Sequence, residues 1–375
     1  MPKNFRGVIS ALFVIALLGI FASAIFAENS SLRLDTGEHI YQTACVACHG
    51  SDGKGTPKSV AGFEQPDSFP DFTRCDQTTA ELDNDYHAVI VHGGRYRGFS
   101  QIMPSFSEAL TTEQISKVIG YLRHFCREPG WPRGELNLPR AIVTEKAYPE
   151  DEEVISSAVN ARGAPGLETH VIHEQRFGKK NQIEVDVPIT FQDQSHIWYG
   201  GIGDATLGIK RALFSNLRRG SILALQGSVL VPSGSRTRSF GSGTTTFETF
   251  AAYDQLFRTN TFFQTQFGAD LPRHTDIAPQ SIFFNTAIGQ IFGAGHGLGR
   301  AWSPMMEFLA QRDLVNSAKT DWDVLPQLQV TISHRQHIRG DLGVRVPVTN
   351  TFGRPIQLQL YFLWDWQDGK LTEGW

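Results

Sequence analysis

The stretch IQLQLYFLWDW, residues 356–366, alternates between apolar and polar side chains along almost its whole length. One face carries Ile356, Leu358, Leu360, Phe362, Trp364 and Trp366, and the other carries Gln357, Gln359, Tyr361 and Asp365. A period of two residues places these two sets on opposite faces of a β-strand. The C-terminal part of the chain is therefore expected to form strands with one apolar and one polar face.

The same alternation recurs upstream of this stretch. It is clear in IEVDVPITF (183–191), QLQVTIS (327–333) and DLGVRVPV (341–348). Weaker alternation starts near eight further positions, which are Val154, Leu167, Asp204, Ser221, Thr244, Thr261, Ser281 and Ala301. These segments together predict about twelve strands in roughly 220 residues.

Alternating strands occur both in secreted sandwiches and in membrane barrels. The even count, the spacing of about nineteen residues per unit and the aromatic residues near strand ends, such as Trp302, Trp322 and Trp364, favour the barrel. We therefore expect an all-β antiparallel transmembrane barrel of about 12 strands over residues 154–375, with a sandwich as the alternative. Its polar side chains would line the lumen, either as a solvated interior or as a selective channel lining: Glu184, Asp186, Asp204, Lys210, Glu307 and Arg345.

The first residues have the pattern of an export signal. Lys3 and Arg6 precede an apolar run from Val8 to Ile20, and small residues follow up to Ala27. We expect a signal peptide over residues 1–27, with a retained membrane anchor as the alternative. Export would place the remaining chain in an oxidising compartment, where disulfides persist.

Residues 32–127 carry helix signals instead of strand alternation. Thr111 and Gln114 form a capping-box pattern before an apolar stripe at helical spacing. All four cysteines lie in this region, which we expect to be a small all-α domain. Residues 128–153 are rich in proline and end in an acidic run, so we expect a linker between the two domains.

The motif Cys45-Val-Ala-Cys48-His49 lies in the helical region. Two thiols at this spacing can add to the vinyl groups of haem, and the adjacent histidine can then ligate the iron. A zinc site would need two further ligands at zinc spacing. A redox dithiol would need a preceding strand and would not need His49. The sequence thus predicts one covalent haem c per chain.

The residues around this motif resemble a monohaem c-type cytochrome over about 34–126. Gly37 and Tyr41 precede the motif, CHGSDGKG continues it, and MPSF occurs near the final helix. The resemblance implies that Met103 is the sixth iron ligand opposite His49. His87, His92 and an open coordination site are the alternatives.

Cys75 and Cys126 remain after the haem motif is assigned. In an exported domain the simplest interpretation is a disulfide between them, and a reactive thiol pair is the alternative.

The C-terminal half resembles outer-membrane proteins of the phenol meta-pathway type through YGGIGDATLGIKRAL (199–213) and GSILALQGSVLVPSG (220–234). The whole layout resembles the cytochrome–porin fusions of iron-oxidising bacteria, in which a haem domain serves electron transfer through the outer membrane. This resemblance implies electron transfer across or at the outer membrane, of the extracellular electron-transfer or iron-oxidation type. This resemblance implies a bacterial outer-membrane location. A 95-residue domain is about 30 Å across, whereas a twelve-strand barrel is about 24 Å wide. The haem domain is therefore expected at the periplasmic mouth.

The net charge of −4 without clustered basic residues argues against nucleic acid as a partner. We expect a one-electron carrier tethered to an outer-membrane barrel, with no catalytic residues. Its expected partners are a periplasmic electron donor or acceptor protein, membrane lipid, and a small redox-active solute or metal ion. The alternative function is a solute pore with a cytochrome docking or regulatory module, and a haem enzyme such as a peroxidase is a third.

Overall fold

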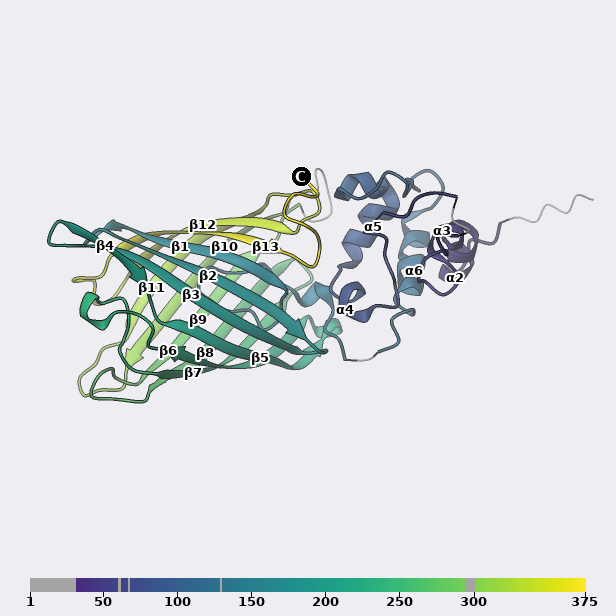
Figure 1. Cartoon of the computed structure of the whole chain (residues 1–375). Helices are drawn as coiled ribbons and strands as arrows, with labels where there is room; N and C mark the ends of the chain where they lie inside the picture. The colour runs from purple at the N-terminus through teal and green to yellow at the C-terminus, as the bar shows by residue number, and fades with distance from the viewer. Residues whose placement is uncertain (1–31, 60–61, 67, 129, 294–300) are drawn as a thin grey trace, which may run out of the picture.

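The computed structural model describes residues 32–375 except 60–61, 67, 129 and 294–300. The expected signal peptide at residues 1–27 lies outside the described residues. A helical domain and a β-barrel are arranged end to end, with the helical domain against one mouth of the barrel (Figure 1). Within the described part of the chain, no helix has both the length and the apolar character needed to cross a bilayer.

The helical domain spans the part of the chain that carries the cysteines. Its elements are α2 (Gly37–Ile40), the π-helical turn η1 (Tyr41–Cys45), α3 (Val46–His49), α4 (Cys75–Thr78), α5 (Asp83–His92), the 3-10 turn η2 (Gly94–Arg97) and α6 (Thr112–Leu122). The predicted capping box is present, because the Thr111 hydroxyl accepts from the Gln114 amide and the Gln114 side chain accepts from the Thr111 amide. This cap fixes the start of α6.

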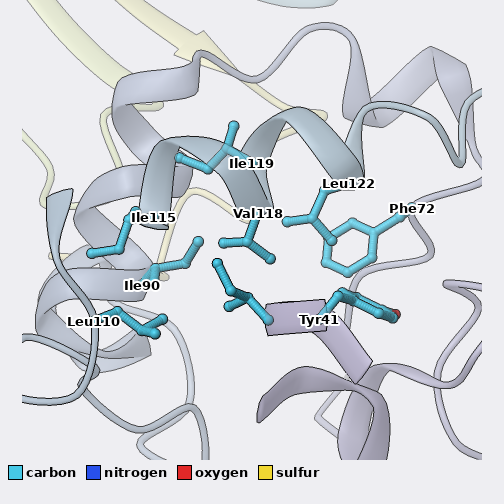
Figure 2. Packing of buried hydrophobic residues seen from close by; sticks show 9 residues of the cluster. Tyr41, Phe72, Ile90, Leu110, Ile115, Val118, Ile119 and Leu122 are labelled. Atoms are coloured by element: carbon cyan, nitrogen blue, oxygen red, sulfur yellow. The ribbon is translucent and has the colours of Figure 1, made fainter. Parts of the chain in front are cut away.

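One apolar core holds these helices together (Figure 2). The stripe predicted for the last helix, including Ile115, Val118 and Leu122, is buried and faces Tyr41 from the first helical run. Ile90 from α5 and Phe72 from the loop before α4 complete the packing. The core therefore joins the segment that carries the Cys45–His49 motif to α6.

The second domain is a closed antiparallel barrel. Its strands are β1 (Glu152–Arg162), β2 (Gly166–Phe177), β3 (Asn181–Gln194), β4 (Ile197–Ile202), β5 (Ala205–Asn216), β6 (Ser221–Val231), β7 (Thr246–Leu256), β8 (Thr261–Pro272), β9 (Ser281–Gln290), β10 (Trp302–Asp313), β11 (Asp321–Thr331), β12 (Ile338–Pro347) and β13 (Ile356–Asp365). One half of β3 pairs with β4 and the other half with β5, so β4 and β5 together act as one interrupted strand of the barrel. β1 pairs with both β2 and β13, which closes the barrel. When β4 and β5 are counted as one strand, the barrel has twelve strands, which confirms the predicted architecture.

The two faces of the barrel differ as the alternation predicts. Ile155, Leu207 and Phe267 point outward and are 47%, 54% and 58% exposed. Of the residues expected in the lumen, Glu184, Lys210 and Glu307 are buried there. Asp204 lies in the break between β4 and β5 instead, where it accepts from loop amides including that of Ser242.

The segment between the two domains, expected as a linker, runs into the barrel. Residues 136–150, here named the lumen segment, are mostly buried and contact side chains that point inward from several strands. Leu136 packs with Ala212 of β5 and Phe250 of β7, and Leu138 packs with Phe262 of β8. The chain then returns to the same mouth and enters β1 at Glu152. We call this mouth the cytochrome end, because the helical domain that lies against it resembles a c-type cytochrome in sequence.

Candidate haem site

The three residues of the attachment motif lie on one continuous helical run. Cys45 ends η1, and Cys48 and His49 lie in α3, which ends at Gly50 with a φ of 71°. The Tyr41 hydroxyl donates to the Gly50 carbonyl at 2.7 Å, which fixes the end of this run. Cys45 and Cys48 are free thiols and are both partly buried. The two thiols are therefore available for thioether formation next to the histidine.

His49 is held in an aromatic environment. Its ring stacks on Phe69 with a centroid distance of 5.2 Å, and it lies 5.1 Å from Phe72 of the core. Its Nδ1 atom is buried and has no hydrogen-bond partner among the described residues. Burial lowers the pKa of His49 to about 4, so the imidazole is neutral at pH 7. A neutral imidazole is the form that ligates iron.

Cys45 has the properties of a structural thiol and not those of a redox dithiol. Burial and the neighbouring Cys48 raise its pKa to about 11. Redox-active cysteines instead have lowered pKa values, because their thiolate is the reactive form. No group of three or more metal-ligating side chains in the described ranges includes the motif residues, so a zinc site lacks its further ligands. The motif fits haem attachment best.

Met103 lies on the loop after η2 and borders the same core as Cys45. Its carbonyl accepts from the Gly94 amide at 3.0 Å, and a Cβ placed on Gly94 would lie 2.4 Å from the Ser100 carbonyl oxygen. Glycine at this position therefore allows the loop to pack closely. The alternative ligand His92 packs its ring on Tyr96 at 4.3 Å. His87 is partly buried, and its Nε2 atom lacks a partner within the described residues.

Cys75 and Cys126 form a disulfide with a Cα–Cα distance of 5.1 Å, as the sequence predicted. It joins the start of α4 to the segment after α6, across 51 residues of chain. A cross-link over a loop of this size stabilises a small domain by about 2–4 kcal/mol.

The helical domain is tied to the barrel by contacts at the cytochrome end. Arg176 of β2 and Gln367 after β13 both donate to the carbonyl of Asp76 in α4, at 2.9 and 3.2 Å. Arg335, in the turn between β11 and β12, donates to the Gly98 carbonyl at 2.8 Å. Its guanidinium carbon lies 4.6 Å from the centre of the Phe99 ring. These contacts hold the side of the helical domain that faces the barrel, where α4 and α5 lie (Figure 1).

Acidic groups from both domains meet in this interface. Burial and the nearby Asp85 raise the pKa of Glu81 to about 7. Burial and Glu81 also raise the pKa of Asp368 well above its usual value. Asp85 pairs with Arg97 at 2.9 Å and accepts from Gln336 of the barrel at 3.3 Å. These carboxyls border a small cavity of about 50 Å³.

Hydrogen bonds to the barrel wall hold the lumen segment. Glu307 of β10 accepts from the Val143 amide at 3.1 Å, the Thr144 amide at 2.6 Å and the Thr144 hydroxyl at 2.5 Å. Asp254 of β7 accepts from the Ala147 amide at 2.9 Å, and Gln182 of β3 from the Glu150 amide at 2.7 Å. Side chains of the wall thus satisfy several backbone donors of the segment.

A buried ion-pair network adds to these bonds. Arg140 of the lumen segment pairs with Glu152 of β1 at 2.8 Å and with Glu174 of β2 at 3.0 Å. Lys210 of β5 pairs with Glu145 of the segment at 3.3 Å. Removing one partner of such a buried pair costs about 3–5 kcal/mol, because it leaves an uncompensated charge. The segment is therefore held in the lumen between the cytochrome end and the middle of the barrel.

Sequence reasoning did not identify the lumen segment. One signal was present, because Arg140 and Lys146 lie in a stretch that precedes the acidic run Glu150–Glu153. Charges on an apparent linker can indicate that it contacts the charged inner face of a barrel. The irregular period of the segment gave no indication of its position.

Residues 33–122 match the family model described as "Cytochrome C oxidase, cbb3-type, subunit III". The helical domain is accordingly a c-type cytochrome domain, for which the family implies haem c and electron transfer. The matched range contains Cys45, Cys48, His49 and Met103. The chain therefore combines a cytochrome domain with a closed antiparallel barrel.

Solved structures similar to this chain match its barrel. An outer membrane channel from Pseudomonas putida F1 has 10% identity and a TM-score of 0.43, covering 60% of this chain and 99% of that one. NanC porin has 8% identity and a TM-score of 0.40, covering 56% and 97%. KdgM porin has 7% identity and a TM-score of 0.38, covering 57% and 98%. No curated protein matches the sequence.

Proposed function

We propose that the protein is a one-electron carrier whose haem c domain is anchored by its barrel at the periplasmic face of the bacterial outer membrane. Cys45 and Cys48 would hold the porphyrin, and His49 and Met103 would ligate the iron. Bound haem supplies the one-electron chemistry. The observation that carries this proposal is the position of the lumen segment, which occupies the barrel between the cytochrome domain and the far mouth.

The membrane location rests on the outer surface of the barrel. Outward-facing side chains are largely aliphatic and phenylalanine residues over the middle of the strands. Trp198 and Trp322 lie near the far ends of their strands, whereas Trp302 and Trp364 lie near the cytochrome end. An apolar band between two aromatic girdles is typical of outer-membrane barrels.

The lengths of the connections between strands support the proposed orientation of the barrel. At the cytochrome end, residues 178–180, 217–220 and 257–260 are short connections. At the far end, residues 163–165 are short, whereas residues 232–245, 273–280 and 348–355 form longer loops. Short turns face the periplasm in outer-membrane barrels. The cytochrome domain would thus face the periplasm, where a soluble redox protein can reach it.

The attachment motif also points to exchange with a periplasmic partner. Figure 1 shows α3, which carries Cys48 and His49, at the end of the cytochrome domain away from the barrel. The contacts to the barrel come instead from α4, α5 and η2. In the proposed orientation the end of the domain that carries the motif would face the periplasm, and the rest of the domain would separate it from the lumen.

The alternative function, a solute pore with a regulatory cytochrome, requires an open lumen. Glu307 lies midway along β10, so its hydrogen bonds to Val143 and Thr144 place the lumen segment at about half the depth of the barrel. A metal ion or redox-active solute that enters from outside would have to pass this point. Electron exchange at the membrane, and not transfer across it, is the function that this arrangement supports best.

Side-specific reduction in liposomes tests the proposal. The holoprotein is reconstituted, its orientation is established by protease access, and a membrane-impermeant reductant is added on one side. We expect reduction only from the cytochrome side. Reduction of correctly sealed liposomes from the far side would instead indicate transfer of electrons across the membrane, as in iron oxidation or extracellular respiration.

A further inference from the structure

An open groove lies on the outer surface of the barrel at its cytochrome end. Its volume is about 440 Å³, within the range of roughly 300–1,000 Å³ that is common for small-molecule sites. The groove is formed by residues of β1, β2, β13 and the tail that follows β13, which are Glu153, His173, Gln175, Trp364, Trp366 and Lys370. None of these residues contributes to the haem site described above.

The strand register places the groove at the edge of the apolar band. Glu153 of β1 is paired with Trp364 of β13 and with His173 of β2, so these three side chains form one row. The next outward-facing row lies two residues closer to the far end of each strand. In this row Ile155 is flanked by Phe362 and Val171. The surface thus changes from an apolar row to a polar and aromatic row within one strand repeat.

The polar groups of the groove carry opposite charges. The Lys370 side chain is 73% exposed, and its Nζ atom lies 3.6 Å from a carboxylate oxygen of Glu373. An ion pair this exposed to solvent contributes little to stability. Glu153 accepts from Nδ1 of His173 at 2.5 Å, which leaves the second carboxylate oxygen for another donor. One cation and one anion are therefore presented side by side above an apolar row.

The aromatic side chains of the groove are fixed. The Trp364 indole donates to the Gly369 carbonyl at 2.8 Å, which also positions the tail that carries Lys370. The Trp366 and His173 rings are nearly parallel, with an interplanar angle of 11° and a centroid distance of 6.4 Å. Aromatic residues of this kind lie at the level of lipid headgroups and glycerol.

We propose that this groove is a specific binding site for a phospholipid with an amine-bearing zwitterionic headgroup from the periplasmic leaflet. The lipid phosphate contacts Lys370, its ammonium contacts Glu153, and its acyl chains lie over Phe362, Ile155 and Val171. This inference rests on the proposed membrane location of the barrel. It assigns the tail after β13 a role in orienting the barrel mouth, and hence the cytochrome domain, at the membrane surface.

Native mass spectrometry of the full-length holoprotein in detergent tests this site. Phosphatidylethanolamine, phosphatidylglycerol, phosphatidylcholine or inorganic phosphate is added to the wild type and to Lys370→Gln and Glu153→Gln variants. We expect one tightly retained phosphatidylethanolamine on the wild type. Lys370→Gln should weaken it about fivefold, as expected for one lysine at a lipid surface. The matched control is Lys319→Gln, an exposed lysine in the loop between β10 and β11 at the far end.

The proposal would be overturned if Lys370→Gln and Lys319→Gln lost bound phosphatidylethanolamine to the same extent. It would also be overturned if the wild type retained phosphatidylglycerol in preference to phosphatidylethanolamine. Competition by inorganic phosphate at millimolar concentration would also overturn it, because the site would then recognise a free anion. Glu153→Gln should weaken the binding of phosphatidylethanolamine but leave the binding of phosphatidylglycerol unchanged. Heat-modifiable gel migration and membrane fractionation of the same samples test the barrel separately. A protein that fractionates with the membrane but retains no lipid would contradict the proposed lipid site and leave the proposed membrane barrel standing.

Discussion

The guanidinium of Arg335, in a turn of the barrel, donates a 2.8 Å hydrogen bond to the carbonyl of Gly98 in the cytochrome domain. The same guanidinium pairs with Glu373 at 2.8 Å and covers the ring of Phe99. The Phe99 amide in turn donates to Gly94, and the Gly94 amide donates to the carbonyl of Met103. A short path of direct contacts therefore connects the barrel to the proposed sixth ligand of the iron.

Replacement of Arg335 by alanine should loosen the loop that carries Met103. A hydrogen bond from a charged donor is worth about 1.5–3 kcal/mol, so we expect a fall of about that size in the stability of the docked cytochrome domain. In the holoprotein the thioether-to-iron absorption band should weaken. Arg335→Lys should restore part of the band, and Arg312→Ala, an exposed site on β10, should leave it unchanged. A full-strength band in Arg335→Ala would contradict this link.

Substitution of Met103 tests the axial ligand itself. Met103→Ala should abolish the thioether-to-iron band and lower the midpoint potential, because a thioether ligand raises the haem potential. His87→Ala and His92→Ala should change neither quantity. A histidine variant that alters the spectrum while Met103→Ala does not would assign the sixth position to that histidine.

Glu307→Ala should release the lumen segment. The substitution removes one acceptor that serves three donors on Val143 and Thr144, and buried donors left without a partner cost about 1–3 kcal/mol each. We expect conductance in planar bilayers to rise from a low value in the wild type. The control is Glu248→Ala on β7, a partly buried carboxylate outside the hydrogen bonds that hold the segment. High conductance of the wild type would instead support the pore function.

The contact between the two domains should weaken as the pH rises. The pKa of Glu81 is raised from 4.5 to about 7 by burial and by Asp85, so the docked state binds its proton more tightly than the undocked state. This contribution is fully present below pH 4.5 and is lost as the pH rises through about 7. The protection factors of amides in α5 and η2, each taken relative to intrinsic exchange at the same pH, should therefore be higher at pH 5 than at pH 8, and Glu81→Gln should remove most of this difference. An unchanged pH dependence in this variant would exclude Glu81 as its source.

The sequence predicts the barrel well because its strands have an apolar outer face and a polar face toward the lumen. The alternation at Ile183–Phe191 and Ile356–Trp366 records that division directly, and the predicted starts near Ser221, Thr261 and Ser281 coincide with β6, β8 and β9. β4 (Ile197–Ile202) was not among the predicted strands, because its sequence IWYGGI does not alternate between apolar and polar residues.

The haem motif could also be predicted from the sequence, because covalent haem attachment requires two cysteines and a histidine at a set spacing, as in Cys45, Cys48 and His49. The lumen segment was not, because its stability comes from contacts with residues more than a hundred positions away, such as Thr144 with Glu307. Such pairings leave no local period in the chain. The role of Arg335 likewise depends on the approach of two domains and not on its neighbours in sequence.

The most direct test of the central claim is redox titration of the oriented holoprotein in sealed liposomes with a membrane-impermeant reductant. The proposed periplasmic carrier predicts that reductant on the cytochrome side reduces all of the accessible haem, and that reductant on the far side reduces none. Haem reduction from the far side, in liposomes shown to be sealed, would contradict the account.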